Sequence, residues 1–190
     1  MEIKYLGGKT VFLKGKKESA LVNPESGLDS RDGSRIVLYT NENDGRADLN
    51  GDKVFINGAG EYEVGGMEIL GINGGEGEAV YRLTIDGFKI VVIGGLKEEL
   101  SEKRIEKVEE ADVLVVGLET DSLVGYKMSR ELAKKWGANY LIPVSINSEL
   151  LNKFLDDADN EGLEAVDNLK MEKVDDLPDG LEIKLLKVVK

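Results

Sequence analysis

The order of the predicted elements is the feature of this 190-residue chain that most constrains its fold. The first half consists of short apolar segments separated by glycine-rich turns, and the second half alternates strands with helical periodicity. This order indicates sheets with helices outside them, in one mixed α and β domain that spans residues 1–190. We expect strands at residues 2–6, 10–14, 19–23, 36–39, 53–57, 67–72, 79–85, 88–93, 112–118, 140–144, 170–174 and 181–189, and helices at 98–110, 127–136 and 148–158.

Turn and capping residues support several of these boundaries. Asp86 and Gly87, between two expected strands, form a strong signal for a two-residue hairpin turn. Ser101 and Ser148 can cap the starts of two helices, because a serine hydroxyl accepts from a free backbone N–H there. Gly137 is a typical residue just after the end of a helix.

Composition and charge exclude several classes of protein. Hydrophobic residues make up 41% of the chain, which is enough for one sizeable core and argues against disorder. The formal net charge of −12 repels nucleic acid and anionic lipid alike, so neither is an expected partner. The N-terminus alternates like a strand, and the longest apolar runs are far shorter than the ~20 residues of a membrane span. We therefore expect a cytoplasmic protein.

A polar stretch follows the apolar run at residues 36–39. Residues 40–46, Thr-Asn-Glu-Asn-Asp-Gly-Arg, resemble the T-H-x-H-x-D-H motif with which the metallo-β-lactamase superfamily holds its catalytic metals. The threonine is retained and the metal ligands are not. The replacements are Asn41 and Asn43 at two histidine positions, Gly45 at the aspartate position and Arg46 at the last histidine position.

Six further segments resemble the small zinc-dependent-hydrolase-like lineage of that superfamily, and their order covers nearly the whole chain. The resemblance implies a four-layer αβ/βα sandwich, with two mixed sheets and outer helices. The segments are residues 5–8 (Y-L-G-G for Y-L-G-H), 21–24 (L-V-N-P for I-D-P), 57–64 (N-G-A-G-E-Y-E-V for D-G-P-G-E-Y-E-V), 93–96 (I-G-G-L for L-G-D-L), 142–145 (I-P-V-S for I-P-M-H) and 176–178 (D-L-P before the last expected strand).

The departures from the family pattern fall on the metal-binding positions. Gly8 and Ser145 stand where the resemblance implies histidine, Asn23 where it implies aspartate, and Gly95 where it implies the aspartate that bridges two metals. We expect no catalytic residue, no metal ligand and no cofactor. The candidates for the lining of a vestigial pocket are Gly8, Asn23, Asn41, Asn43, Gly45, Arg46, Gly95 and Ser145.

Zinc chemistry explains why these departures bear on function. Proteins bind zinc through cysteine, histidine and carboxylate, and this chain contains no cysteine and no histidine. Without a metal, no water ligand reaches a pKa near ~7 for hydrolysis. We therefore predict a metal-free, catalytically inactive protein with a binding, assembly or regulatory role, and expect as partners a second copy or an active paralogue. The small-molecule ligand is unknown.

Two alternatives remain open from the sequence. The first is a hydrolase that uses Mg²⁺, Mn²⁺ or Ca²⁺ through oxygen ligands, or no metal. Asp48, Asn50 and Asp52 have calcium-loop spacing, but Lys53 and Ala59 occupy positions that need glycine and a bidentate glutamate, which favours a plain surface loop. The second is a structural subunit of a homo-oligomer.

Arg46 permits a sharper hypothesis. Its guanidinium could lie in the former metal cavity and pair with Glu42, Asp44 or Glu98, so that a fixed cation replaces the metal in holding the loops together. The competing interpretation is an arginine that faces solvent.

Overall fold

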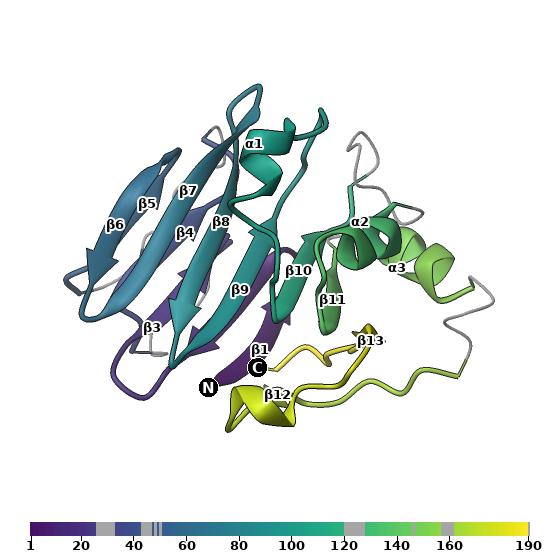
Figure 1. The fold of residues 1–190 in the computed structure, drawn as a ribbon. Coiled ribbons are helices and arrows are strands. Elements are labelled where there is room, and N and C mark those ends of the chain that lie inside the picture. The colour runs from purple at the N-terminus through teal and green to yellow at the C-terminus, as the bar shows by residue number, and fades with distance from the viewer. Residues whose placement is uncertain are drawn as a thin grey trace.

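Two mixed β-sheets face each other in the computed structural model (Figure 1). The structure describes residues 1–25, 33–42, 47, 49, 51–119, 128–145, 147–156 and 162–189. The first sheet has six strands in the order β12-β1-β2-β3-β4-β5, with β3, β4 and β5 parallel and the others antiparallel. Its strands are β1 (Glu2–Gly7), β2 (Thr10–Lys14), β3 (Ser19–Val22), β4 (Ile36–Tyr39), β5 (Val54–Asn57) and β12 (Leu169–Lys170).

The second sheet has seven strands in the order β13-β11-β10-β9-β8-β7-β6. Strands β6 to β9 are antiparallel hairpin partners, and β9, β10, β11 and β13 run parallel. The predicted sandwich of two mixed sheets is therefore confirmed. The strands are β6 (Gly60–Val64), β7 (Met67–Gly75), β8 (Glu78–Ile85), β9 (Phe88–Ile93), β10 (Val113–Gly117), β11 (Tyr140–Val144) and β13 (Glu182–Ile183).

The helices are few and short. They are α1 (Glu102–Ile105), α2 (Ser129–Lys135), α3 (Ser148–Leu155) and the 3₁₀ turn η3 (Val174–Asp176). The apolar side chains of α1, α2 and α3 pack in one cluster with the outer face of the second sheet. The outer face of the first sheet packs against Ala47 and Leu49. No helix in the described ranges is long and apolar enough to cross a membrane.

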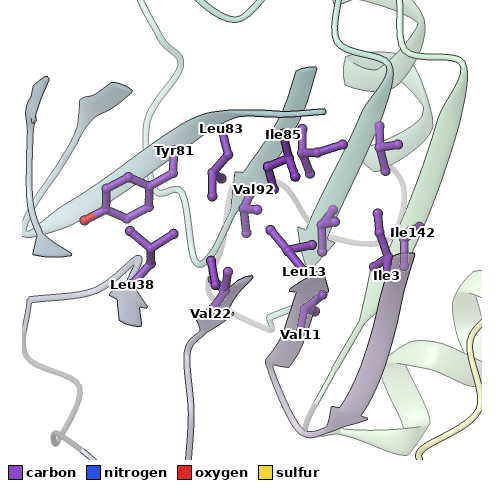
Figure 2. Packing of buried hydrophobic residues seen from close by; sticks show 14 of the residues in the cluster. Ile3, Val11, Leu13, Val22, Leu38, Tyr81, Leu83, Ile85, Val92 and Ile142 are labelled. Atoms are coloured by element: carbon purple, nitrogen blue, oxygen red, sulfur yellow. The ribbon is translucent and has the colours of Figure 1, made fainter. Parts of the chain in front are cut away.

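The main core lies between the two sheets. Val22 and Leu38 of the first sheet and Tyr81, Leu83 and Val92 of the second point into it (Figure 2). Side chains along a strand alternate between its two faces, so β4 needs apolar residues throughout to fill the core on one side and the outer cluster on the other. That need explains the continuous apolar run that precedes the polar stretch in the sequence.

The hairpin prediction is confirmed and the long-helix prediction is wrong. Asp86 and Gly87 both have positive φ, 53° and 89°, as a type I′ turn requires. The expected helix at 98–110 is helical only at α1, and Ser101 caps it without a side-chain hydrogen bond. After Ile105 the chain continues in turns, with i→i+3 hydrogen bonds such as Val108 N to Ile105 O at 2.8 Å. Val108 is instead fully buried in the cluster beneath.

Three other boundaries differ from prediction. Asn147, and not Ser148, caps α3, because its Oδ1 accepts from Glu149 N at 2.9 Å. The strands expected at 170–174 and 181–189 shrink to two residues each, and Val174 begins the 3₁₀ turn. Strand β6 is an addition. It forms the edge of the second sheet and alternates between exposed Glu61 and Glu63 and half-buried Tyr62 and Val64, but the glycines on both sides of it resemble turns.

Candidate functional site

The two sheets meet where β4 ends. Ala79 N donates to Thr40 O at 2.6 Å and Glu42 N donates to Gly77 O at 2.9 Å, so the chain after β4 pairs with the start of β8. Gly94, which follows β9, lies against this junction, since a Cβ on it would be 2.1 Å from Thr40 Oγ1. The ends of β4 and β9 therefore share one edge of the sandwich, which we call the strand-end edge.

Asn23 holds Thr40 in place at this edge. Its Oδ1 accepts from Thr40 N at 2.8 Å and from Thr40 Oγ1 at 3.2 Å, and its own carbonyl accepts from Thr10 Oγ1 at 2.8 Å. Asn23 has a φ of 48°, a left-handed conformation that asparagine tolerates better than most residues. The Asn23 amide oxygen is thus occupied by Thr40, the residue that follows β4.

Asn41 joins the two sheets through its side chain. Its Nδ2 donates to Glu78 Oε1 at 2.5 Å, and Glu78 is buried at the start of β8. The amide therefore presents a donor, which a metal ion cannot use, at a position where the family pattern has histidine.

Carboxylates occupy the space beside two of the glycines. A Cβ on Gly8 would lie 1.7 Å from Glu25 Oε1, and a Cβ on Gly95 would lie 2.2 Å from Glu119 Oε2. Any larger residue at either position requires the glutamate to move. The sequence pattern identifies the two missing side chains but does not identify the glutamates that fill their places.

Lys9 and Glu119 form an ion pair across the strand-end edge. The Nζ to Oε1 distance is 2.8 Å, and the two side chains are 18% and 27% exposed. Lys9 lies in the turn between β1 and β2, next to Gly8, whereas Glu119 follows β10. The pair ties together two loops that are 110 residues apart in the sequence.

Tyr5 and Ser145 connect the β1–β2 turn with the end of β11. The Tyr5 hydroxyl lies 2.9 Å from Gly8 O and 3.0 Å from Ser145 O. Burial raises the Tyr5 pKa, the hydrogen bond to Ser145 opposes that rise, and the Glu25 charge adds to it. The Ser145 hydroxyl donates to Leu118 O at 2.9 Å and accepts from Asn147 N at 3.0 Å. It is therefore engaged with backbone groups.

The structure thus brings five of the eight candidate positions to one edge: Gly8, Asn23, Asn41, Gly95 and Ser145. Asn43, Gly45 and Arg46 lie outside the described residues, as do Asp44, Asp48 and Asn50. The Arg46 pairing and the calcium-loop spacing stay predictions. Sequence reasoning missed Lys9, Glu25, Glu78 and Glu119, and the only local signal was that Lys9 follows a candidate position.

The residues that the structure describes do not fit a catalytic zinc. In the described part of the chain, no group of three or more His, Cys, Asp or Glu side chains could hold a metal ion. The Asn41 side-chain amide donates to the Glu78 carboxylate, and the Glu119 carboxylate already forms an ion pair with the Lys9 ammonium. Histidine and cysteine, two of the three usual zinc ligand types, are absent from the entire sequence.

Comparison with known proteins agrees with the fold. A family model described as the beta-lactamase superfamily domain matches residues 2–145. That span is most of the chain, and the chain belongs to the metallo-β-lactamase superfamily. No curated protein matches the sequence.

Solved structures of this superfamily superpose over nearly the whole chain. A proposed Zn-dependent hydrolase of the metallo-β-lactamase superfamily from Thermotoga maritima has a TM-score of 0.81 and 20% identity, over 97% of each chain. Igni18, a metallo hydrolase from Ignicoccus hospitalis, has a TM-score of 0.60 and 11% identity, over 90% of this chain and 99% of its own. YhfI from Bacillus subtilis, a metallo-β-lactamase fold protein, has a TM-score of 0.60 and 11% identity, over 98% of this chain and 95% of its own. At these identities the likeness concerns the fold.

Proposed function

We propose that this chain is a metal-free, non-hydrolytic member of the superfamily that uses the fold for binding, assembly or regulation. One observation carries the proposal: the Lys9 ammonium lies 2.8 Å from Glu119, whose carboxylate fills the space beside Gly95. The resemblance to the family implies a metal-bridging aspartate at that glycine. A positive charge that belongs to the protein therefore stands close to where the family has its metal.

Electrostatics make the lysine and a divalent ion competitors for the same carboxylate. An ammonium at 2.8 Å already satisfies Glu119, and a metal ion placed beside it would be repelled by the lysine. Glu78 is likewise engaged with Asn41. The acidic side chains at this edge thus stabilise the folded chain in place of coordinating an ion.

The remaining groups that the structure describes at the strand-end edge lack the features of a metal-free hydrolase. A serine nucleophile needs an adjacent general base, and the chain has no histidine to act as one. Ser145 donates to Leu118 O, so its hydroxyl proton is directed at a backbone carbonyl and not at a base. We therefore assign it a structural role in joining β10 and β11.

Hydrolysis assays test this function directly. Purified protein is incubated with phosphodiester, β-lactam and lactone substrates in the presence of Zn²⁺, Mn²⁺, Mg²⁺ or Ca²⁺, alongside Glu119→Gln and the control Glu149→Gln. Glu149 is exposed on α3, and its carboxylate pairs with Lys153 of the same helix and not with a residue of the strand-end edge. We expect no turnover above background. Turnover with any metal that Glu119→Gln abolishes and Glu149→Gln retains would overturn the proposal.

Partner identity is the second part of the proposal. An assembly role predicts association either with a second copy or with an active paralogue. Sedimentation velocity over a hundredfold range of concentration measures the first. A monomer at every concentration that also fails to associate with a metal-containing relative would remove the assembly role and leave small-molecule binding.

A further inference from the structure

Strand β6 is an open edge of the second sheet. It lies at one end of the strand order and pairs with β7 alone (Figure 1). Its register with β7 is regular from Gly60 to Val64, without the register shifts that interrupt β1 and β7, and it contains no proline. Edge strands that are neither shortened nor interrupted can accept a further strand. The edge strands β12 and β13, by contrast, are only two residues long.

The turn between β6 and β7 fixes which backbone groups of β6 face outward. The two glycines at 65–66 have positive φ, 60° and 87°, and this two-residue turn makes Val64 and Met67 the closing pair that exchanges both hydrogen bonds. Hydrogen-bonded and non-hydrogen-bonded pairs alternate along an antiparallel ladder, so the N–H and C=O groups of Glu61 and Glu63 point away from β7. Among the described residues, no hydrogen bond from outside the β6–β7 ladder engages these four groups.

The outer face of this edge carries negative charge that no ion pair neutralises. Glu61 and Glu63 are two residues apart and share this face, and Glu68 of β7 stands directly opposite Glu63. All three are exposed, and no ion pair within the described residues includes any of them. Arg82 lines the same hollow, but its guanidinium donates to Lys107 O at 2.7 Å. Like charges directly opposite each other are destabilising, so a positive group placed on this face would relieve the repulsion.

The inner face of the same strand is apolar. Tyr62 and Val64 are half-buried and pack against the core between the sheets. An added strand would place every second side chain beside them, and apolar side chains there would extend the core. The two faces of β6 therefore favour a segment in which basic residues alternate with apolar ones.

A second copy of this chain does not provide that pattern through β6. Antiparallel pairing of two copies of β6 places Glu61 opposite Glu63 and adds repulsion to a face that is already negative. The net charge of −12 acts in the same direction. The glutamates thus oppose self-association at this edge and attract a basic strand.

We propose that β6 binds an extended segment of a partner protein as an added antiparallel strand. The segment carries lysine or arginine opposite Glu61 and Glu63 and an apolar residue opposite Tyr62. The four outward backbone groups supply the hydrogen bonds, and the carboxylates select the charge. The proposal does not rest on the metal-free state of the strand-end edge, so hydrolytic turnover there would leave it unchanged.

Synthetic peptides test the proposal on the intact protein. The probe is acetyl-Thr-Lys-Val-Lys-Val-Thr-amide, and two matched peptides replace both lysines with glutamine or with glutamate. Titration followed by NMR of the isotope-labelled protein gives each affinity and the residues that are contacted. We expect saturable binding of the lysine peptide at Glu61 and Glu63, binding about 2–10-fold weaker for the glutamine peptide and a further loss of about 2–10-fold for the glutamate peptide. No saturation with the lysine peptide, or equal affinity for all three, would overturn the proposal.

Backbone methylation distinguishes strand addition from charge attraction alone. In an antiparallel pairing, lysines opposite Glu61 and Glu63 direct their N–H groups at β6, whereas the N–H groups of the valines point away. N-methylation of both lysine nitrogens should therefore abolish binding, and N-methylation of both valine nitrogens should retain it. Equal losses from both peptides, or a loss from the valine isomer alone, would contradict the antiparallel addition.

Charge reversal locates the binding at β6. Glu61→Lys combined with Glu63→Lys should invert the preference, so that the glutamate peptide binds more tightly than the lysine peptide. Glu164→Lys combined with Glu172→Lys is the control, since both residues are exposed on either side of β12, and the same change in net charge should leave the preference as it was. If the β6 variant fails to fold, the methylated peptides decide on the unaltered protein. An unchanged preference in the β6 variant, or a dimer through β6 that the peptide displaces, would overturn the proposal.

Discussion

The core between the sheets and the strand-end edge are built by different kinds of interaction. The core is apolar and follows the alternation of the strands, as Leu13, Leu83 and Val92 illustrate in Figure 2. The edge is polar, and side-chain pairs such as Lys9 with Glu119 and Asn41 with Glu78 hold its loops together. The part of the superfamily fold that apolar packing between the sheets specifies is thus retained. The edge needs only contacts that join the loops, and here a lysine and glutamates make such contacts.

A core truncation should have the largest effect on stability. Leu13 is fully buried between the sheets, so Leu13→Ala should lower the free energy of unfolding by about 2–5 kcal/mol through lost burial and a residual cavity. Urea unfolding followed by circular dichroism measures the change. The neighbouring exposed Lys14 is the control, and Lys14→Ala should stay within about 0.5 kcal/mol. Equal losses for both variants would contradict the packing described for β2.

Substitutions at two adjacent glycines distinguish tight packing against a buried residue from contact with a flexible side chain at the strand-end edge. A Cβ on Gly94 would meet Thr40, which is fully buried, so Gly94→Ala should cost about 1–3 kcal/mol through overpacking. A Cβ on Gly95 would meet the end of the Glu119 side chain, which can turn away. Gly95→Ala should therefore lower the free energy of unfolding only by the contribution of the Lys9–Glu119 ion pair. The same unfolding assay compares them. A larger loss for Gly95→Ala than for Gly94→Ala would contradict these contacts.

Breaking the edge ion pair should cost less than the core truncation. Lys9→Met and Glu119→Gln should each cost about 1–2 kcal/mol, between the values for exposed and buried pairs. The double variant should cost little more than either, because both remove one interaction. Lys153→Met is the matched control, since Lys153 and Glu149 are 2.7 Å apart but 48% and 71% exposed. Its smaller loss would show that burial matters, and additive losses at Lys9 and Glu119 would refute the coupling.

The smallest expected effect concerns the Tyr5 hydroxyl. Tyr5→Phe should cost about 1 kcal/mol, because a carbonyl at the edge loses its hydrogen bond. Folding raises the Tyr5 pKa above its ordinary 10.0, so the unfolded chain loses this proton first. The Tyr5 contribution to stability is therefore present below pH 10.0 and decreases as the pH rises through the raised pKa. Burial also raises the pKa of Tyr81 to about 12, so absorbance titration at 295 nm should show a late-ionising signal that decreases by one tyrosine, and does not vanish, in Tyr5→Phe.

The sequence predicted the central strands well because their signal is local. The apolar runs that became β4 and β10 are buried on both faces, and no other element of that length accommodates them. The edge strand β6 was missed although Glu61 to Val64 alternate between exposed and half-buried side chains, because the glycines on both sides of it resemble turns. The helix at α1 was predicted too long, because the apolar spacing that suits a helix also suits the turns at 106–108 that bury Val108.

For the candidate site, the sequence predicted only which metal ligands are missing. The family pattern identified Gly8 and Gly95 as positions without a metal-ligating side chain, because the sequence itself gives the residue type at each position. The replacing contacts depend on topology, because the fold alone brings Lys9 beside Glu119 across 110 residues of chain. Asn23 and Ser145 are likewise directed at backbone groups by the local loop conformation, which residue type does not specify.

Metal content of the purified protein tests the central claim most directly. The chain is expressed without a histidine tag in medium supplemented with zinc, dialysed without chelator, and analysed by mass spectrometry of the metals. Because Lys9 pairs with Glu119 and no histidine or cysteine is present, we predict zinc far below one ion per chain and no rise in melting temperature on adding it. One or more zinc ions per chain that survive dialysis and raise the melting temperature would contradict the account.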